Sequence, residues 1–102
     1  MNLIKLEENI SSSNIEDFKS KIEKSFNKSD FNIVIDFTKI NLICSSGLGI
    51  LISALKKARL NEGDIKLLIP ETNKEITQIF NITRLNTVFN IYINSSEIEN
   101  AK

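Results

Sequence analysis

Apolar segments with two different periods alternate along this chain, and the alternation limits the folds that it can adopt. Residues 31–37 are rich in β-branched and aromatic side chains, as a buried central strand requires. After Ser45, apolar residues instead follow the spacing of an amphipathic helix, at Leu48, Leu51, Ile52, Leu55 and Ala58. A buried strand that leads into a long helix indicates a parallel sheet with crossover connections.

The same two patterns recur on both sides of this unit. Residues 3–6, 65–69 and 88–93 predict three further strands. Capping-box spacing at residues 13–16 and 72–75 predicts that helices begin at Ser13 and Thr72. Inward-facing stripes follow each box, with Ile15, Phe18, Ile22 and Phe26 in the first helix and Ile76, Ile79 and Phe80 in the second. Gly63 suits a left-handed cap after the long central helix.

The predicted order is therefore strand, helix, strand, helix, strand, helix, strand. We expect an α/β fold with a small, mostly parallel four-stranded sheet, helices packed on it and a shortened N-terminal edge strand. The chain has 102 residues, of which 41% are hydrophobic, and this is enough for one core. Residues 1–102 are accordingly expected to form a single domain, with a polar or weakly helical tail over residues 94–102.

Composition argues against several classes of function. Lys and Arg together number 13, as do Asp and Glu, so the chain has no net field to attract nucleic acid. It contains no histidine, which removes Ser-His and Cys-His nucleophile pairs and the commonest metal ligand. We therefore expect a protein that is not an enzyme and needs no cofactor or metal.

Targeting signals are also missing from the pattern. The N-terminus lacks the basic start and long apolar run of a signal peptide, and the single cysteine cannot form an internal disulfide. The longest uncharged run, residues 40–55, is too short and too polar to span a bilayer, which takes about 20 apolar residues. These features predict a cytoplasmic protein without membrane insertion.

The sharpest local signal is the run Cys44, Ser45, Ser46, Gly47, Leu48 at the junction between an apolar segment and the central helix. Backbone N–H groups at a helix N-terminus are unpaired and favour negative charge, so a phosphate on Ser45 would be stabilised there. A structural explanation is also open, in which Ser45 caps the helix and the glycines permit close packing.

Residues 33–49, which read IVIDFTKINLICSSGLG, closely resemble the signature of the STAS family of anti-sigma-factor antagonists. Residues 79–89, IFNITRLNTVF, are similar to the family's closing helix, and the match extends over about residues 31–93. The resemblance implies that Ser45 corresponds to a serine that a partner kinase phosphorylates. It also implies a partner-binding surface formed by Cys44, Ser45, Ser46, Gly47 and Leu48.

In that family the unphosphorylated antagonist binds an anti-sigma factor that is also a serine kinase, and so releases a sigma factor. A PP2C-type phosphatase reverses the phosphorylation. The resemblance therefore implies a protein–protein switch, which we expect to be a monomer or a weak dimer.

Cys44 stands where the family usually has Asp. It is either a redox-sensitive thiol or a small, partly buried replacement, and the substitution favours an alternative role as a non-phosphorylated STAS adaptor in a signalling or lipid-transport complex. A nucleotide-binding or hydrolytic enzyme is disfavoured, because residues 44–49 match neither the P-loop nor the Gly-x-Ser-x-Gly elbow. Lys56, Lys57 and Arg59 are either partner contacts or a solvated helix face.

Overall fold

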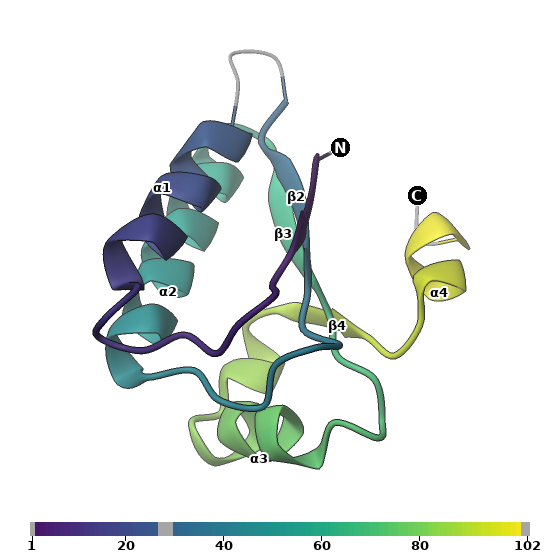
Figure 1. The fold of residues 1–102 in the computed structure, drawn as a ribbon. Coiled ribbons are helices and arrows are strands. Elements are labelled where there is room, and N and C mark those ends of the chain that lie inside the picture. The colour runs from purple at the N-terminus through teal and green to yellow at the C-terminus, as the bar shows by residue number, and fades with distance from the viewer. Residues whose placement is uncertain (1, 27–29, 101–102) are drawn as a thin grey trace.

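A computed structural model describes residues 2–26 and 30–100 and confirms the predicted α/β order (Figure 1). The strands are β1 (Asn2–Lys5), β2 (Asn32–Asp36), β3 (Asp64–Leu68) and β4 (Asn90–Tyr92). The helices are α1 (Ile15–Ser25), α2 (Ser45–Leu60), α3 (Lys74–Ile82) and α4 (Ser95–Asn100). A short 3-10 helix, Leu85–Thr87, precedes β4 and was not predicted.

The four strands form one parallel sheet whose spatial order, β1-β2-β3-β4, is also their order along the chain. Right-handed crossovers between neighbouring parallel strands return on the same side of the sheet. Figure 1 accordingly shows α1 and α2 side by side on one face, with α3 beyond the end of the sheet where β2 finishes. The start of α2 lies at this same end.

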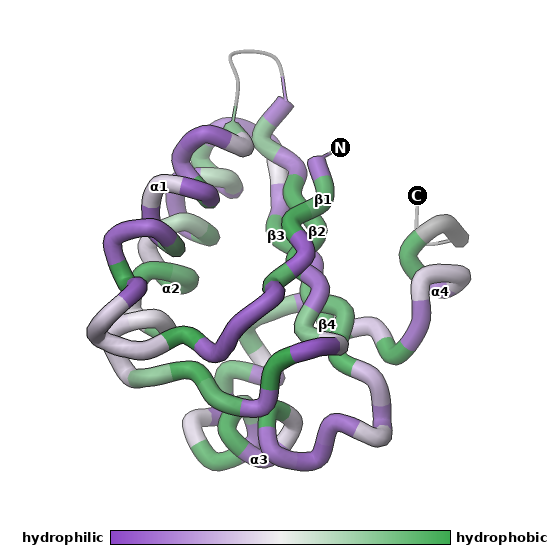
Figure 2. The backbone as a smooth tube through the Cα atoms, in the orientation of Figure 1, coloured by the Kyte–Doolittle hydropathy of each residue, from purple (hydrophilic) through white to green (hydrophobic). Residues whose placement is uncertain are grey.

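The core divides between the two faces of the sheet because strand side chains alternate. Four strand residues are almost fully buried in the cluster that includes α1 and α2: Ile33, Ile35, Ile65 and Leu67. These segments appear as hydrophobic stretches in Figure 2. Val34 and Leu68 face the other side and pack on Ile98 of α4. The segment predicted as a polar or weakly helical tail contains a helix, and Ile98 of this helix covers part of the second face.

Both N-cap positions lie one residue after the predicted ones, at Asn14 instead of Ser13 and at Asn73 instead of Thr72. Although Asn14 occupies the N-cap position of α1, its side chain makes no capping hydrogen bond. Its side-chain oxygen accepts a hydrogen bond from the Ser11 N–H at 2.9 Å, and its amide donates to the Asn9 carbonyl at 2.8 Å. Asn73 does cap α3, because its Oδ1 accepts from the N–H of Ile76. Contacts with neighbouring loops decide both positions.

The predicted left-handed glycine after α2 is wrong. Glu62 has the positive φ, 62°, whereas Gly63 does not. What Gly63 provides is room, since a Cβ at this position would lie 2.1 Å from the carbonyl oxygen of Phe31. The glycine is needed where β3 starts beside β2.

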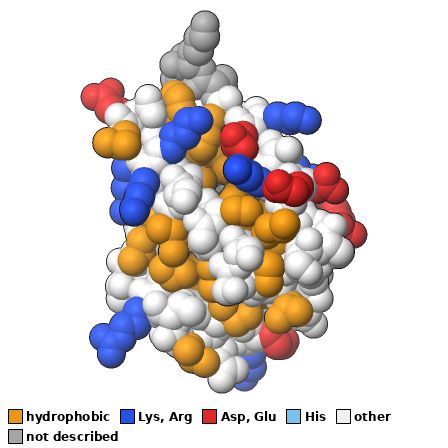
Figure 3. Space-filling view, turned by 90° about the vertical axis from the view of Figure 1, so that its left-hand side faces the viewer, with side chains coloured by type: hydrophobic (Ala, Val, Ile, Leu, Met, Phe, Trp, Pro, Cys, Tyr) orange, Lys and Arg blue, Asp and Glu red, His pale blue; other side chains and the backbone are white. Residues whose placement is uncertain are grey.

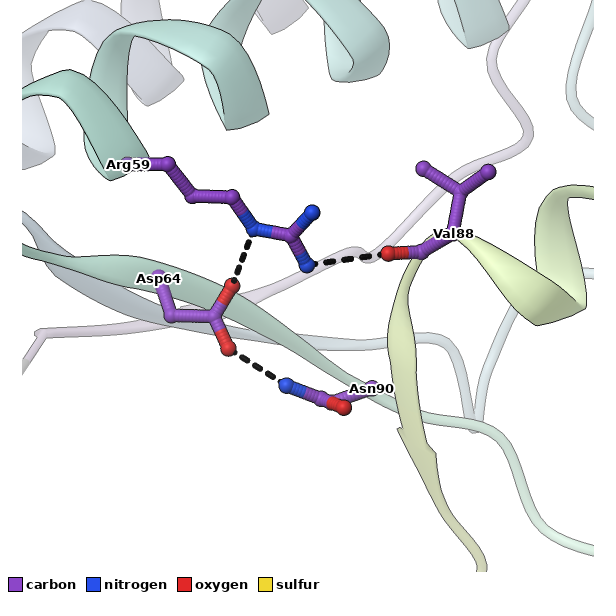
Figure 4. Close-up of polar contacts among 4 residues, drawn as sticks. All are labelled: Arg59, Asp64, Val88 and Asn90. Atoms are coloured by element: carbon purple, nitrogen blue, oxygen red, sulfur yellow. Dashed lines mark hydrogen bonds and ion pairs between the residues drawn. The ribbon is translucent and has the colours of Figure 1, made fainter.

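The last strand is shorter than the predicted residues 88–93, and a polar cluster accounts for its start (Figure 4). Arg59 of α2 donates to the Val88 carbonyl at 2.9 Å and pairs with Asp64 at 3.4 Å. Asn90 donates to the second oxygen of the Asp64 carboxylate. The Val88 carbonyl is thus held by a helix side chain before β4 begins.

Substitutions of the adjacent residues Glu62 and Gly63, just after α2, separate the effect of backbone conformation on stability from the effect of steric space. We predict that Gly63→Ala lowers the free energy of unfolding by about 2 kcal/mol or more, because its Cβ meets a backbone carbonyl that cannot move away cheaply. Glu62→Gly should instead be neutral or stabilising by up to ~1 kcal/mol, since it removes a left-handed non-glycine residue. Urea unfolding measures both, and a Gly63→Ala protein as stable as the parent would contradict the packing explanation.

Candidate functional site

The loop between β2 and α2 is fixed by polar side chains from outside it. Asp36 ends β2, is only 9% exposed and accepts a hydrogen bond from the Thr38 N–H at 2.8 Å. Asn73 donates to two carbonyls of the loop, at 2.8 Å to Phe37 and at 2.7 Å to Ile40. The cap of α3 therefore also shapes the approach to Ser45.

The next part of the loop is bound to the segment between β1 and α1. Asn9 makes two hydrogen bonds with Asn41, one to its backbone N–H at 2.9 Å and one to its side-chain oxygen at 3.0 Å. Both asparagines are exposed, so this pair aligns the two loops without adding to the core.

An isolated parallel bridge between Ile10 and Ile43 completes the alignment. The Ile10 N–H donates to the Leu42 carbonyl at 3.1 Å, and the Cys44 N–H donates to the Ile10 carbonyl at 2.9 Å. Both isoleucine side chains are buried. The residue that immediately precedes Ser45 is consequently held by a second segment of the backbone.

The predicted site residues occupy the first turn of α2 but differ in exposure. Cys44 is the half-buried N-cap residue, Ser45 and Ser46 are exposed, and Gly47 and Leu48 are buried. A partner that approaches this turn therefore meets the two serines directly. Gly47 and Leu48 would support such a surface from below.

Ser45 does not cap α2, so the structural explanation for this serine is wrong. Cys44 occupies the cap position with extended backbone angles, φ −75° and ψ 167°, and its side chain makes no cap hydrogen bond. Within residues 2–26 and 30–100, the Ser45 and Ser46 hydroxyls have no hydrogen-bond partner. The N–H groups of Ser45, Ser46 and Gly47 precede the first intrahelical bond, from Leu48 to Cys44, and those of the exposed residues Ser45 and Ser46 are open to an anion.

The two glycines of the motif, Gly47 and Gly49, have different surroundings. A Cβ on Gly47 would lie 2.8 Å from Ile43 Cγ1 and 3.0 Å from Ile10 Cγ2, so this glycine lets α2 seat against the bridged isoleucines. Gly49 has nothing within 4 Å of its ideal Cβ in the described part of the chain. The predicted close packing therefore applies to Gly47 alone.

Sequence analysis missed one exposed apolar residue of the loop, Leu42. Its side chain is 51% exposed three residues before Ser45, while its carbonyl is bonded to Ile10. A large apolar side chain on a rigid, exposed loop is a common anchor in protein interfaces. Its place between the apolar residues Ile40 and Ile43, which are both buried, gave no sequence signal, because burial in this loop depends on the tertiary bridge.

No cluster of three or more Cys, Asp or Glu side chains that could hold a metal occurs in the described residues. Across those same residues, no helix has the length and apolar character needed to cross a membrane.

A model of the STAS domain matches residues 2–98, nearly the whole chain. The chain belongs to the STAS domain family. The predicted family and fold are thereby confirmed, and the match includes the first turn of α2 and the loops that hold it. No curated protein sequence gives a significant match.

Two solved structures share this STAS fold. A crystal structure of a candidate anti-sigma factor antagonist from Thermotoga maritima is 24% identical, with a TM-score of 0.83, over 96% of this chain and 85% of that one. An NMR structure of the protein TM1081 is 22% identical, with a TM-score of 0.81, over 97% of this chain and 78% of that one. At these identities the likeness concerns the fold.

Cap substitutions test the geometry of the site. Cys44→Ser should raise the free energy of unfolding by about 0.5 to 1 kcal/mol, because a hydroxyl at the cap position can accept from an open N–H of the first turn. Ser45→Ala should change it by less than ~0.3 kcal/mol, since the Ser45 side chain satisfies no group of the fold. Chemical denaturation checks both values. If Ser45→Ala lowered the free energy of unfolding by about 1 kcal/mol, Ser45 would be shown to cap α2 after all.

Proposed function

We propose that this STAS protein is an anti-sigma-factor antagonist switched by phosphorylation of Ser45. The observation that carries the proposal is the exposed Ser45 hydroxyl, which the fold does not use, at an open helix N-terminus. A kinase can reach such a hydroxyl without unfolding the protein. The motif resemblance of residues 33–49 supplies the direction of the switch, with binding in the unphosphorylated state.

The proposed partner is an anti-sigma factor that is also a serine kinase, and a PP2C-type phosphatase would reset the cycle. The antagonist itself performs no chemistry and requires no cofactor or metal. We place it in the cytoplasm as a monomer or weak dimer. Cys44, Ser45 and Ser46 would meet the partner, with Gly47 and Leu48 fixing their positions from the core.

The charge of one phosphate can supply much of the free energy that this switch requires. A phosphoserine adds about −1.5 to −2 charges at neutral pH, and the open N–H groups of the first turn stabilise it in the free protein. At an interface built for a neutral serine, the same dianion must be desolvated or repelled, which costs several kcal/mol. Reversing a two-state equilibrium from 1:99 to 99:1 takes about 5.5 kcal/mol, so one phosphate supplies much of the change.

A second function is favoured by one observation. Cys44 provides no carboxylate beside Ser45, unlike the family motif, and its side chain takes no part in capping. A STAS module that works as a permanent adaptor in a signalling or lipid-transport complex would not need that carboxylate. In this alternative, Ser45 and Ser46 would contact the partner without being modified.

Phosphate mapping separates these functions. Small histidine-kinase-like ATPases from the source genome are incubated with the protein and ATP, and peptides are analysed by mass spectrometry. We predict that the phosphate is found on Ser45. The Ser45→Ala protein should bind the kinase as tightly as the unphosphorylated parent does. The Ser45→Asp protein should bind it at least tenfold more weakly, with an unchanged melting curve. Ser46→Ala is the matched control and should still be phosphorylated.

Phosphate on Ser46 alone would move the switch to the neighbouring serine. Stable binding of a partner without phosphorylation of either serine would support the adaptor and contradict the proposed cycle.

A further inference from the structure

A groove of about 500 Å³ runs between α1 and α2 and begins at the proposed switch. Ser46 lies at one end and Lys57 at the other, so the groove follows α2 for about three turns. Its apolar lining includes Ile22 and Phe26 of α1 and Ile50 of α2. Figure 3, which views this side of the molecule, shows hydrophobic side chains gathered on the face, with both Lys or Arg and Asp or Glu side chains around them.

Gly49 lines this groove and has no function within the described fold. Its φ is not positive, and its ideal Cβ would have nothing within 4 Å among the described residues. By contrast, a Cβ at Gly47 or Gly63 would collide with the protein itself. A glycine in a helix destabilises it by roughly 0.5 to 1 kcal/mol relative to alanine. The absence of a side chain at Gly49 therefore leaves open space that a partner approaching α2 from outside can enter.

The charge of the groove indicates the character of that occupant. Helix α2 contains Lys56, Lys57 and Arg59 but no Asp or Glu, and its N-terminus adds partial positive charge. On the groove walls, Lys19 of α1 and Lys57 of α2 are accompanied by a single carboxylate, Glu23. A second copy of the same groove would carry the same excess of positive charge. An acidic partner is complementary.

We propose that the groove between α1 and α2 receives an acidic amphipathic helix of the partner protein. Apolar side chains of that helix would enter the hollow above Gly49, and its carboxylates would lie near Lys19 and Lys57. This mode, a helix laid in an apolar groove, is common in peptide recognition. The inference rests on the proposed function, because the partner is the anti-sigma factor that reads Ser45.

The position of Ser45 beside one end of the groove would bring its phosphate close to the partner helix. Ser46 forms one end of the groove, and Ser45 is its neighbour in the same exposed turn. A dianion on Ser45 would stand beside an acidic helix and repel it, while leaving α1 and α2 unchanged. The groove therefore explains how one modification at its end could release a partner bound along its whole length.

Filling the groove tests its occupation. The probe is the purified ATPase that phosphorylates Ser45, titrated by calorimetry under non-phosphorylating conditions. Gly49→Phe should weaken binding about tenfold or more, because its ring would occupy the hollow while its Cβ has no atom of the described protein within 4 Å. Gly49→Ala should weaken binding by a few-fold and yet raise the melting temperature by roughly 4 °C, since it improves the helix. Opposite signs for stability and binding exclude a simple folding defect.

A neighbouring pair of lysines tests the charge. Lys57→Glu, on the groove wall, should weaken binding about fivefold or more and reduce its dependence on salt. Lys56→Glu is the matched control, because Lys56 is exposed on the same helix outside the groove lining, and it should stay within about twofold of the parent.

Distinct outcomes separate failure of this inference from failure of the proposed function. If Ser45→Asp abolishes binding while Gly49→Phe and Lys57→Glu bind like the parent, the switch stands and the groove proposal is wrong. If no ATPase binds or phosphorylates the chain, both fail. Two other results would also overturn the proposal. One is self-association of the protein, measured by sedimentation, that Gly49→Phe disrupts. The other is binding of dodecanoate in the groove in preference to the ATPase, measured by amide NMR.

Discussion

The backbone bridge between Ile10 and Ile43 is the constraint on which the site depends. It joins the loop before α1 to the loop before α2, and it consumes the N–H of Cys44, the last residue before the helix. Gly47 then seats the first turn against the two bridged side chains. With these contacts made by the backbone and by buried isoleucines, Ser45 is left free of any structural task.

This division of labour suits a switch that acts by charge. Most of the groups that hold the site are carbonyls, N–H groups and the uncharged amides of Asn9 and Asn73, and the Asp36 carboxylate at the end of β2 is the charged one. A phosphate on Ser45 therefore meets a frame held mainly by uncharged groups. The open N–H groups of the helix stabilise it in place, and the altered surface is what a partner detects.

The periodicity of apolar residues was enough to predict four strands in a mostly parallel sheet and the helices α1, α2 and α3, because burial of alternate strand residues and helical stripes dominates the fold. Helix boundaries were less predictable. Ser13 is as good at capping as Asn14, and Thr72 is also a favoured cap residue, although somewhat less so than Asn73. The position of Asn73 also follows from its bonds to Phe37 and Ile40, more than 30 residues away. Such contacts have no local sequence signal.

The candidate site shows the same limit. The motif located Ser45 correctly at the start of α2, but the sequence could not show whether its hydroxyl was used as a cap. Nor could it separate Gly47, which avoids a collision, from Gly49, which avoids none. Both distinctions depend on the bridge and on the angle between α1 and α2, which only the packed structure defines.

Amide hydrogen exchange of the Ser45-phosphorylated and unmodified proteins tests the central claim, that modification changes the surface on an unchanged frame. The reporters are the N–H groups of Ile10 and Cys44, which form the bridge. We predict that their exchange rates stay within about threefold and that amide shift changes are confined to the first turns of α2 and the loop before it. Loss of protection by more than about tenfold at either amide, or shift changes throughout β2 and β3, would contradict the account and show that phosphorylation acts by opening the site.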